Sequence, residues 1–186
     1  MIKSVNSKTE LTQHEIALLK YTFLCFLTDG SKFLIMYLLF HLLSLSTDYL
    51  ISLGVLLSIR NFTGGIHLKH YSSCLLFTFS FVSSVIFLSH SIAVNENIQI
   101  MTLLMMIPIV FIVGPVTCSK RPKLSEQQSL IYKSIACCIL GIYTSVFICT
   151  KTIPYQNLMY WGIVFQIIQL VVAKLIKERR TYNEKI

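Results

Sequence analysis

The sequence predicts an all-α, polytopic integral membrane protein with about six transmembrane helices and an interfacial amphipathic helix before them. Hydrophobic residues make up 54% of the 186 residues and charged residues only 13%, with a mean hydropathy of +0.69. This composition leaves too little polar surface for a soluble domain of this length. Several apolar stretches reach the roughly 20 residues that a membrane span needs. The length suggests one membrane-embedded domain over residues 1–186.

The first expected element is a helix over residues 9–28, with the sequence TELTQHEIALLKYTFLCFLT. Its apolar residues fall on one side of a helix and its early polar residues on the other, as in helices that lie in the membrane interface. The TDG sequence at Thr28–Gly30 is expected to end this helix in a turn. The polar N-terminus lacks the cleavage pattern of a signal peptide, so we expect it to be retained.

Residues 31–59 form one long apolar run that polar residues interrupt at Ser46–Asp48. This run is either one very long tilted helix or a hairpin of two short helices. Charge favours the hairpin, because basic loops stay cytoplasmic and a hairpin puts all basic clusters on one side. Whether the two short helices are full spans or a partly re-entrant pair stays open. The basic clusters are the N-terminus (Lys3, Lys8, Lys20), residues 60–70, residues 120–133 and residues 174–185.

Four further apolar stretches are expected to span the membrane: Ser73–Val94, Ile98–Cys118, Tyr132–Thr150 and Tyr155–Ala173. With the hairpin they give six spans. Both termini and the polar segment 60–73 then lie on the cytoplasmic side, while the opposite connections hold a single basic residue, Lys151.

The chain is basic, with 16 Lys and Arg against 8 Asp and Glu, and its pI is near 9.2. In a membrane protein such an excess marks cytoplasmic loops and contact with anionic lipid headgroups. Nucleic acid is not an expected partner, because the basic residues are spread between apolar spans and form no single face. The cysteines show no CxxC pair and no repeated spacing, so no disulfide framework is expected. They are Cys25, Cys74, Cys118, Cys137, Cys138 and Cys149.

The segment from Arg60 to Cys74, RNFTGGIHLKHYSSC, concentrates chemically active side chains at a membrane face. Gly64 and Gly65 permit a bend, and Cys74 follows near the start of the third span. A helix N-terminus and basic neighbours both favour the thiolate, which is the nucleophilic form of cysteine. Among the cysteines, Cys74 alone has two nearby histidines, and a Cys–His pair is the minimum apparatus for covalent catalysis.

Spacing alone does not choose between the two histidines. On one continuous helix His67 would lie two turns from Cys74, about 10.5 Å away. A general base needs a contact of roughly 3 Å, so His67 can serve only if the chain before Tyr71 bends back. His70 precedes Cys74 by four residues and would be its neighbour on the same helix face.

Other interpretations of this segment are weaker but distinct. An inert cysteine with histidines that bind headgroups would need no chemistry at all. Zinc could bind His67, His70 and Cys74, but no HExxH, CxxC or nearby carboxylate supports it, so no metal or other cofactor is expected. A non-enzymatic transporter or membrane-complex subunit would carry polar residues along a pathway, and only His41, Gln166 and Gln169 lie within spans.

The pattern R-x4-G-x-H-x6-C, which comprises Arg60, Gly65, His67 and Cys74, resembles that of the AgrB family of bacterial quorum-sensing peptidases. The likeness extends over most of the chain and includes its length, the polar N-terminal helix and the basic loop GPVTCSKRPKLSE. The resemblance implies that Cys74 is the nucleophile, that His67 is the general base, and that Arg60 and Gly65 support the site. It requires a bent, non-helical segment over residues 64–69. His70 matches no required family position and stays open as an alternative base.

The resemblance also implies a membrane cysteine endopeptidase of the bacterial cell membrane. Its substrate would be a propeptide with an amphipathic helix and an acidic C-terminal tail. Cys74 would release the tail and hold the remaining peptide as a thioester, which then closes to a thiolactone or lactone autoinducing peptide. Membrane lipids are the other expected partners, and the resemblance is compatible with a homodimer.

Overall fold

A computed structural model describes residues 13–66, 70–116, 125–150 and 154–183, and within these residues the protein is all-α. The described residues contain one isolated parallel β-bridge, between Gly64 and Val116. The predicted fold class is therefore confirmed. The helices are α1 (Gln13–Leu42), α2 (Ser46–Thr63), α3 (Tyr71–Ser91), α4 (Glu96–Val113), α5 (Glu126–Cys149) and α6 (Gln156–Asn183).

Helices α3, α4, α5 and α6 are long and apolar enough to cross a membrane, which confirms a multi-pass membrane protein. They coincide with the four later spans that the sequence predicts. In the first part of the chain the apolar stretch Gly30–Leu42 is shorter. α2 has 18 residues and begins with the polar sequence Ser46–Asp48. The described chain thus has six helices, in place of six spans with a separate interfacial helix before them.

The predicted turn at Thr28–Gly30 is wrong, because α1 runs through it without a break. Gly30 has an open position at its Cβ and needs no left-handed backbone, so the helix accommodates it. A single helical glycine costs only about 1 kcal/mol relative to alanine. Ser31 donates its hydroxyl to the Thr28 carbonyl, a bond within the helix that adds local support. The expected interfacial helix over residues 9–28 therefore continues directly into the hairpin, with residues 9–12 lying outside the described residues.

The chain reverses between α1 and α2, as the hairpin interpretation predicts. Ser44 adopts a left-handed backbone with φ of 59°, and the Leu45 amide donates to the Phe40 carbonyl at 2.8 Å. Phe40 stacks on Tyr49 with ring centroids 5.2 Å apart, which holds the two arms together. A single long helix over residues 31–59 is thereby excluded.

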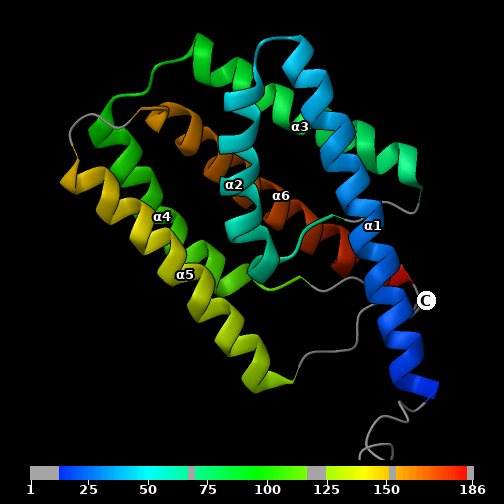
Figure 1. Cartoon of the computed structure of the whole chain (residues 1–186). Coiled ribbons are helices and arrows are strands. Elements are labelled where there is room, and N and C mark those ends of the chain that lie inside the picture. Colours follow the sequence, from blue (N-terminus) through cyan, green and yellow to red (C-terminus); the bar gives the residue numbers. More distant parts are fainter. Residues whose placement is uncertain (1–12, 67–69, 117–124, 151–153, 184–186) are drawn as a thin grey trace, which may run out of the picture.

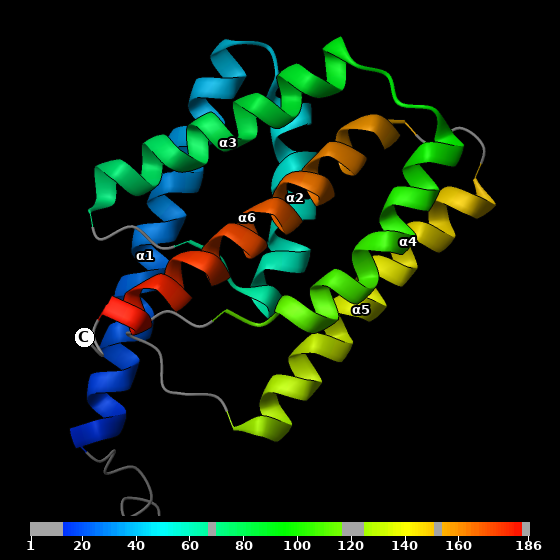
Figure 2. The same cartoon turned by 180° about the vertical axis from the view of Figure 1, so that it is seen from behind.

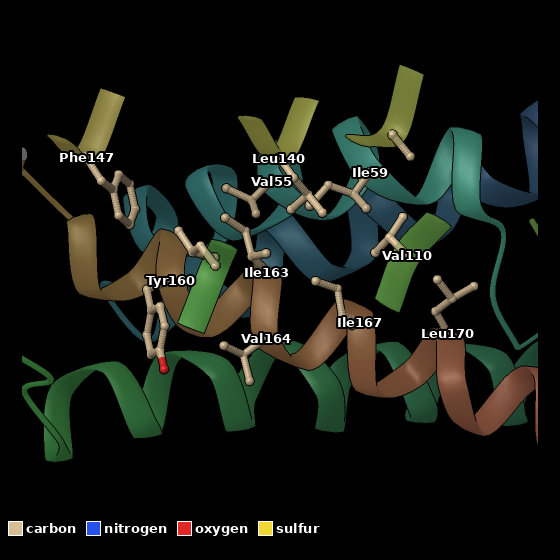
Figure 3. Packing of buried hydrophobic residues seen from close by; sticks show 12 residues of the cluster. Val55, Ile59, Val110, Leu140, Phe147, Tyr160, Ile163, Val164, Ile167 and Leu170 are labelled. Atoms are coloured by element: carbon tan, nitrogen blue, oxygen red, sulfur yellow. The ribbon is translucent and has the colours of Figure 1, made fainter. Parts of the chain in front are cut away.

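Helix α6 lies at the centre of the bundle. In Figures 1 and 2, α4 and α5 form a pair along one side, α1 and α3 lie on the other, and α2 and α6 pass between them. In the apolar part of α6 50% of the residues are buried, against 17–22% in α3, α4 and α5. Figure 3 shows side chains of α2, α4, α5 and α6 meeting in one cluster. Gly162 permits a close approach here, because a Cβ at this position would lie 3.3 Å from Val55 Cγ1.

The helices alternate in direction, so that their connections gather at two opposite ends of the bundle (Figure 1). At one end, which we name the Asp48 end, the Asp48 carboxylate lies 3.2 Å from the ring of His90, and Asn157 accepts a hydrogen bond from the Val94 amide. At the other, the Gly64 end, the Val116 amide donates to the Thr63 carbonyl at 2.9 Å. The polar segment with Cys74 belongs to the Gly64 end, and so does Lys174 of α6, which donates to the Ile112 carbonyl near the end of α4.

Candidate active site

The site is built on the turn that follows α2. Gly64 closes the helix with φ of 75° and ψ of −159°, a combination that is open essentially to glycine alone. Its backbone pairs with Val116, and a Cβ at Gly64 would lie 2.2 Å from the Val116 carbonyl oxygen. Both the torsion angles and the close approach therefore require glycine here. The predicted bend is confirmed over Gly64–Ile66, whereas residues 67–69 lie outside the described residues.

Arg60 and Gly65, the two residues expected to support the site, lie together at this turn. The Arg60 guanidinium donates to the Ile66 carbonyl through Nη2 at 3.2 Å. A Cβ built on Gly65 would lie 3.6 Å from Arg60 Nε and 3.4 Å from Gln169 Nε2. Arg60 thus reaches forward along the chain and braces the non-helical segment against the end of its own helix.

Two glutamines of α6 line the buried side of the turn. Gln166 is fully buried and donates its amide to the Gly64 carbonyl at 3.3 Å. Gln169 is 4% exposed, and neither of its polar atoms has a hydrogen-bond partner among the described residues. Sequence reasoning treated these two as isolated polar residues within a span. Their spacing of three residues, which puts them on one helix face, was the signal that they act together.

Cys74 lies in the first turn of α3, as the sequence predicts. Its amide donates to the His70 carbonyl at 3.1 Å, the first backbone bond of the helix. The first turn of a helix carries partial positive charge, so Cys74 lies at the positive end of the α3 dipole. Cys74 is buried, whereas Cys138 and Cys149 on α5 are exposed and Cys137 is half-buried. Of the described cysteines, Cys74 alone combines a helix N-terminus with shielding from solvent.

The structure adds one residue that the sequence did not indicate. Lys32 of α1 places its ammonium nitrogen 3.6 Å from the sulfur of Cys74. The same ammonium lies 5.4 Å from the centroid of the Tyr71 ring, and the Tyr71 hydroxyl hydrogen-bonds the Ser31 hydroxyl at 3.0 Å. The sequence contained one indication of this role, because Lys32 is a charged residue inside an apolar run. Such residues in membrane proteins are usually functional. The separation of Lys32 from Cys74 by 42 residues concealed the contact.

The structure treats the two histidines differently. His70 is the N-cap of α3, with an extended backbone and an exposed side chain. The prediction that His70 and Cys74 are neighbours on one helix face required a helical backbone at His70. The backbone of His70 is extended, so this requirement is not met. His67 lies outside the described residues, so the predicted pairing with Cys74 stays a prediction. The zinc interpretation includes His67 and is untested for the same reason.

Comparisons with known proteins identify the family of the chain. Residues 1–170 match the family AgrB, accessory gene regulator B. A protein of Clostridium beijerinckii that is named AgrB-like is 27% identical over 163 residues, which cover 87% of this chain and 80% of that relative. No solved structure matches the chain. The matched range includes the whole polar segment and Lys32 of α1, which contacts Cys74.

Proposed function

This chain belongs to the AgrB family, and from that premise we propose that it is a membrane cysteine endopeptidase that removes the C-terminal tail of a quorum-sensing propeptide. Membership supports a role in quorum-sensing peptide processing for this multi-pass membrane protein. The observation that carries the finer proposal is the position of Cys74, buried in the first turn of α3 directly after a non-helical glycine turn. Covalent catalysis needs a nucleophile whose surroundings activate it. The acyl-enzyme that it forms has to be shielded from water.

In the first step His67 accepts the proton of the Cys74 thiol, and the thiolate attacks the carbonyl carbon that precedes the tail. The amide C–N bond then breaks, and protonated His67 returns its proton to the departing amine of the tail. The rest of the propeptide stays bound to Cys74 as a thioester. His70 is the alternative base if His67 does not reach the sulfur. No cofactor enters this step.

In the second step an internal cysteine or serine of the propeptide attacks the thioester carbonyl. The attacking thiol or hydroxyl gives its proton to His67, a thiolactone or lactone ring forms, and the sulfur of Cys74 leaves and takes that proton from His67. Water would divert the thioester to a linear product, so the site has to exclude it. Burial of Cys74, with a relative exposure of 9%, supports this requirement.

The substrate we propose has an amphipathic helix that binds the membrane and an acidic tail that binds the Gly64 end. The C-terminal part of α6 supports this, because it carries exposed basic residues such as Lys177 and Arg179 at that end. Attraction of an acidic tail to such residues weakens as salt increases. Lipid headgroups are the second class of partner.

Intramembrane polar residues give little support to a transporter or a membrane-complex subunit. Gln166 donates to the Gly64 carbonyl, and Gln169 lies beside Gly65. Both glutamines thus belong to the turn of the candidate active site. A neighbouring gene for a small peptide with an acidic tail would further support the peptidase, and a transporter operon would oppose it.

The test is to co-express the protein with its propeptide and to follow release of the tail by mass spectrometry. We expect no release with Cys74→Ala or His67→Ala and partial release with His70→Ala. Cys138→Ala is the matched control, because Cys138 is an exposed cysteine of α5 and should be dispensable. Release by the Cys74→Ala variant would refute the proposal. Loss of release with His70→Ala, together with activity of His67→Ala, would make His70 the base.

A further inference from the structure

We propose that Lys32 is a further catalytic residue, whose ammonium group contacts the Cys74 sulfur and stabilises the negative charge that this sulfur carries as it attacks. This inference rests on the proposed function, because it concerns the same nucleophile. It assigns a chemical role in the site to α1, a helix that is far from the polar segment in the sequence.

The geometry brings the ammonium of Lys32 to the reacting atom. The distance of 3.6 Å between Lys32 Nζ and Cys74 Sγ is that of a hydrogen bond to sulfur. Lys32 is half-buried and Cys74 buried, so the charge acts across a region that solvent screens only in part. The ammonium of Lys32 and the N-terminus of α3 both put positive charge beside the sulfur that becomes negative during the reaction.

Neighbouring contacts fix the position of Lys32. Ser31 hydrogen-bonds the hydroxyl of Tyr71, and the ammonium of Lys32 lies over the ring of Tyr71. Two consecutive residues of α1 therefore bind the first turn of α3, three residues before the nucleophile. A lysine held over an aromatic ring loses less conformational freedom when it pairs with the sulfur than a mobile lysine would.

The role of Lys32 in the reaction is electrostatic and involves no bond to it. The proton of the thiol passes to His67, and Lys32 keeps its own proton throughout. As the sulfur attacks, its negative charge moves to the carbonyl oxygen of the substrate and the contact with Lys32 weakens. Loss of the Lys32 charge should therefore slow the chemical step and leave propeptide binding unchanged.

The test measures the reactivity of Cys74 without substrate. The full-length protein in detergent is treated with iodoacetamide at neutral pH, and mass spectrometry follows alkylation at Cys74 and, as an internal reference, at exposed Cys149 at the end of α5. With Lys32→Met we expect Cys74 to react about ten-fold more slowly, because the attacking sulfur loses a stabilising positive charge, and Cys149 to react unchanged. Lys32→Arg keeps the charge and should restore most of the rate.

Lys133→Met is the matched control. Lys133 of α5 also lies over an aromatic ring, 5.6 Å from the centroid of Phe111, but it belongs to another helix pair. We expect this variant to alkylate at Cys74 like the unmodified protein. In propeptide processing, Lys32→Met should lower kcat and leave KM unchanged.

The outcomes separate this inference from the proposed function. If Lys32→Met alkylates at Cys74 at the normal rate, Lys32 has no such role, even if Cys74→Ala abolishes processing. If Lys32→Arg is as slow as Lys32→Met, or if Cys149 changes in parallel with Cys74, the effect is structural and the inference fails. If Cys74→Ala still processes the propeptide, the proposed function itself fails.

Discussion

Gly64 and Gly65 are adjacent, yet the structure constrains them differently. Gly64 has backbone angles that other residues rarely adopt, and its missing side chain gives room to the Val116 carbonyl. Gly65 has no positive φ, and its missing side chain faces the ends of two flexible side chains, those of Gln169 and Arg60. The first glycine therefore shapes the backbone, and the second makes room beside the arginine.

We predict that Gly64→Ala destabilises the protein more than Gly65→Ala. At Gly64 an alanine is strained by about 1–3 kcal/mol and also collides with backbone. At Gly65 the new methyl group would lie 3.4 Å from Gln169 Nε2, so that the amide has to move by only a few tenths of an ångström. Thermal unfolding in detergent compares the two variants. A larger loss with Gly65→Ala would show that the turn is not held as described.

At the residue level the sequence predicted what local chemistry can reveal. It indicated Cys74 by its polar neighbours and the bend by the glycine pair, and both lie where expected. It could not indicate Lys32 or the hydrogen bond from Gln166 to Gly64, which spans 102 residues. Contacts at such separations depend on how whole helices pack, and no local pattern encodes them.

Among the elements, α1 differs most from its prediction. A Thr-Asp-Gly sequence is a turn signal in water, where the solvent satisfies the exposed backbone groups. Near a membrane an interrupted helix leaves amide and carbonyl groups without partners at a cost of several kcal/mol, whereas a helical glycine costs about 1 kcal/mol. The helix therefore continues through Gly30, and this continuity carries Lys32 to the first turn of α3.

Substitutions at Gly30 test whether α1 is continuous. Because nothing lies within 4 Å of the open Cβ position, we expect Gly30→Ala to stabilise the protein by up to about 1 kcal/mol. Gly30→Pro should destabilise it by about 3 kcal/mol, since proline removes a backbone bond and collides with the preceding turn. Both effects are measurable by thermal unfolding in detergent. Marked destabilisation by Gly30→Ala would instead indicate a turn with a positive φ at this position.

At the scale of the whole molecule, the bundle separates two kinds of connection. Its Asp48 end is held by neutral and acidic groups, among them Gln99, whose side chain bonds Gln156 and Asn157. At the Gly64 end, Lys174 of α6 donates to the Ile112 carbonyl, and Lys177 and Arg179 of the same helix are exposed. The charge pattern of the sequence predicts that the basic clusters share one side of the membrane. Which end faces the cytoplasm is a separate prediction, since it depends on basic residues and not on packing.

Labelling at the two ends tests that orientation. In a background whose native cysteines are alanine, we place one cysteine at exposed Ala93, at the Asp48 end, or at exposed Gln127, at the start of α5 near the Gly64 end. Neither residue takes part in helix capping, since Asn95 caps α4, and Ser125 with Gln128 caps α5. An impermeant maleimide should label Ala93→Cys in intact cells and Gln127→Cys only in inverted vesicles.

A permeant maleimide is the control, because it should label both positions in intact cells if both variants are folded and reactive. The reverse pattern would keep the bundle but turn it over, and would put Cys74 outside, where a propeptide made in the cytoplasm does not reach it. Labelling of both positions from one side would contradict the separation of the two ends itself. If the two ends are labelled from opposite sides in the predicted orientation, the Gly64 end faces the cytoplasm. Cys74, Lys32 and the basic end of α6 then lie on the side where the acidic tail is synthesised.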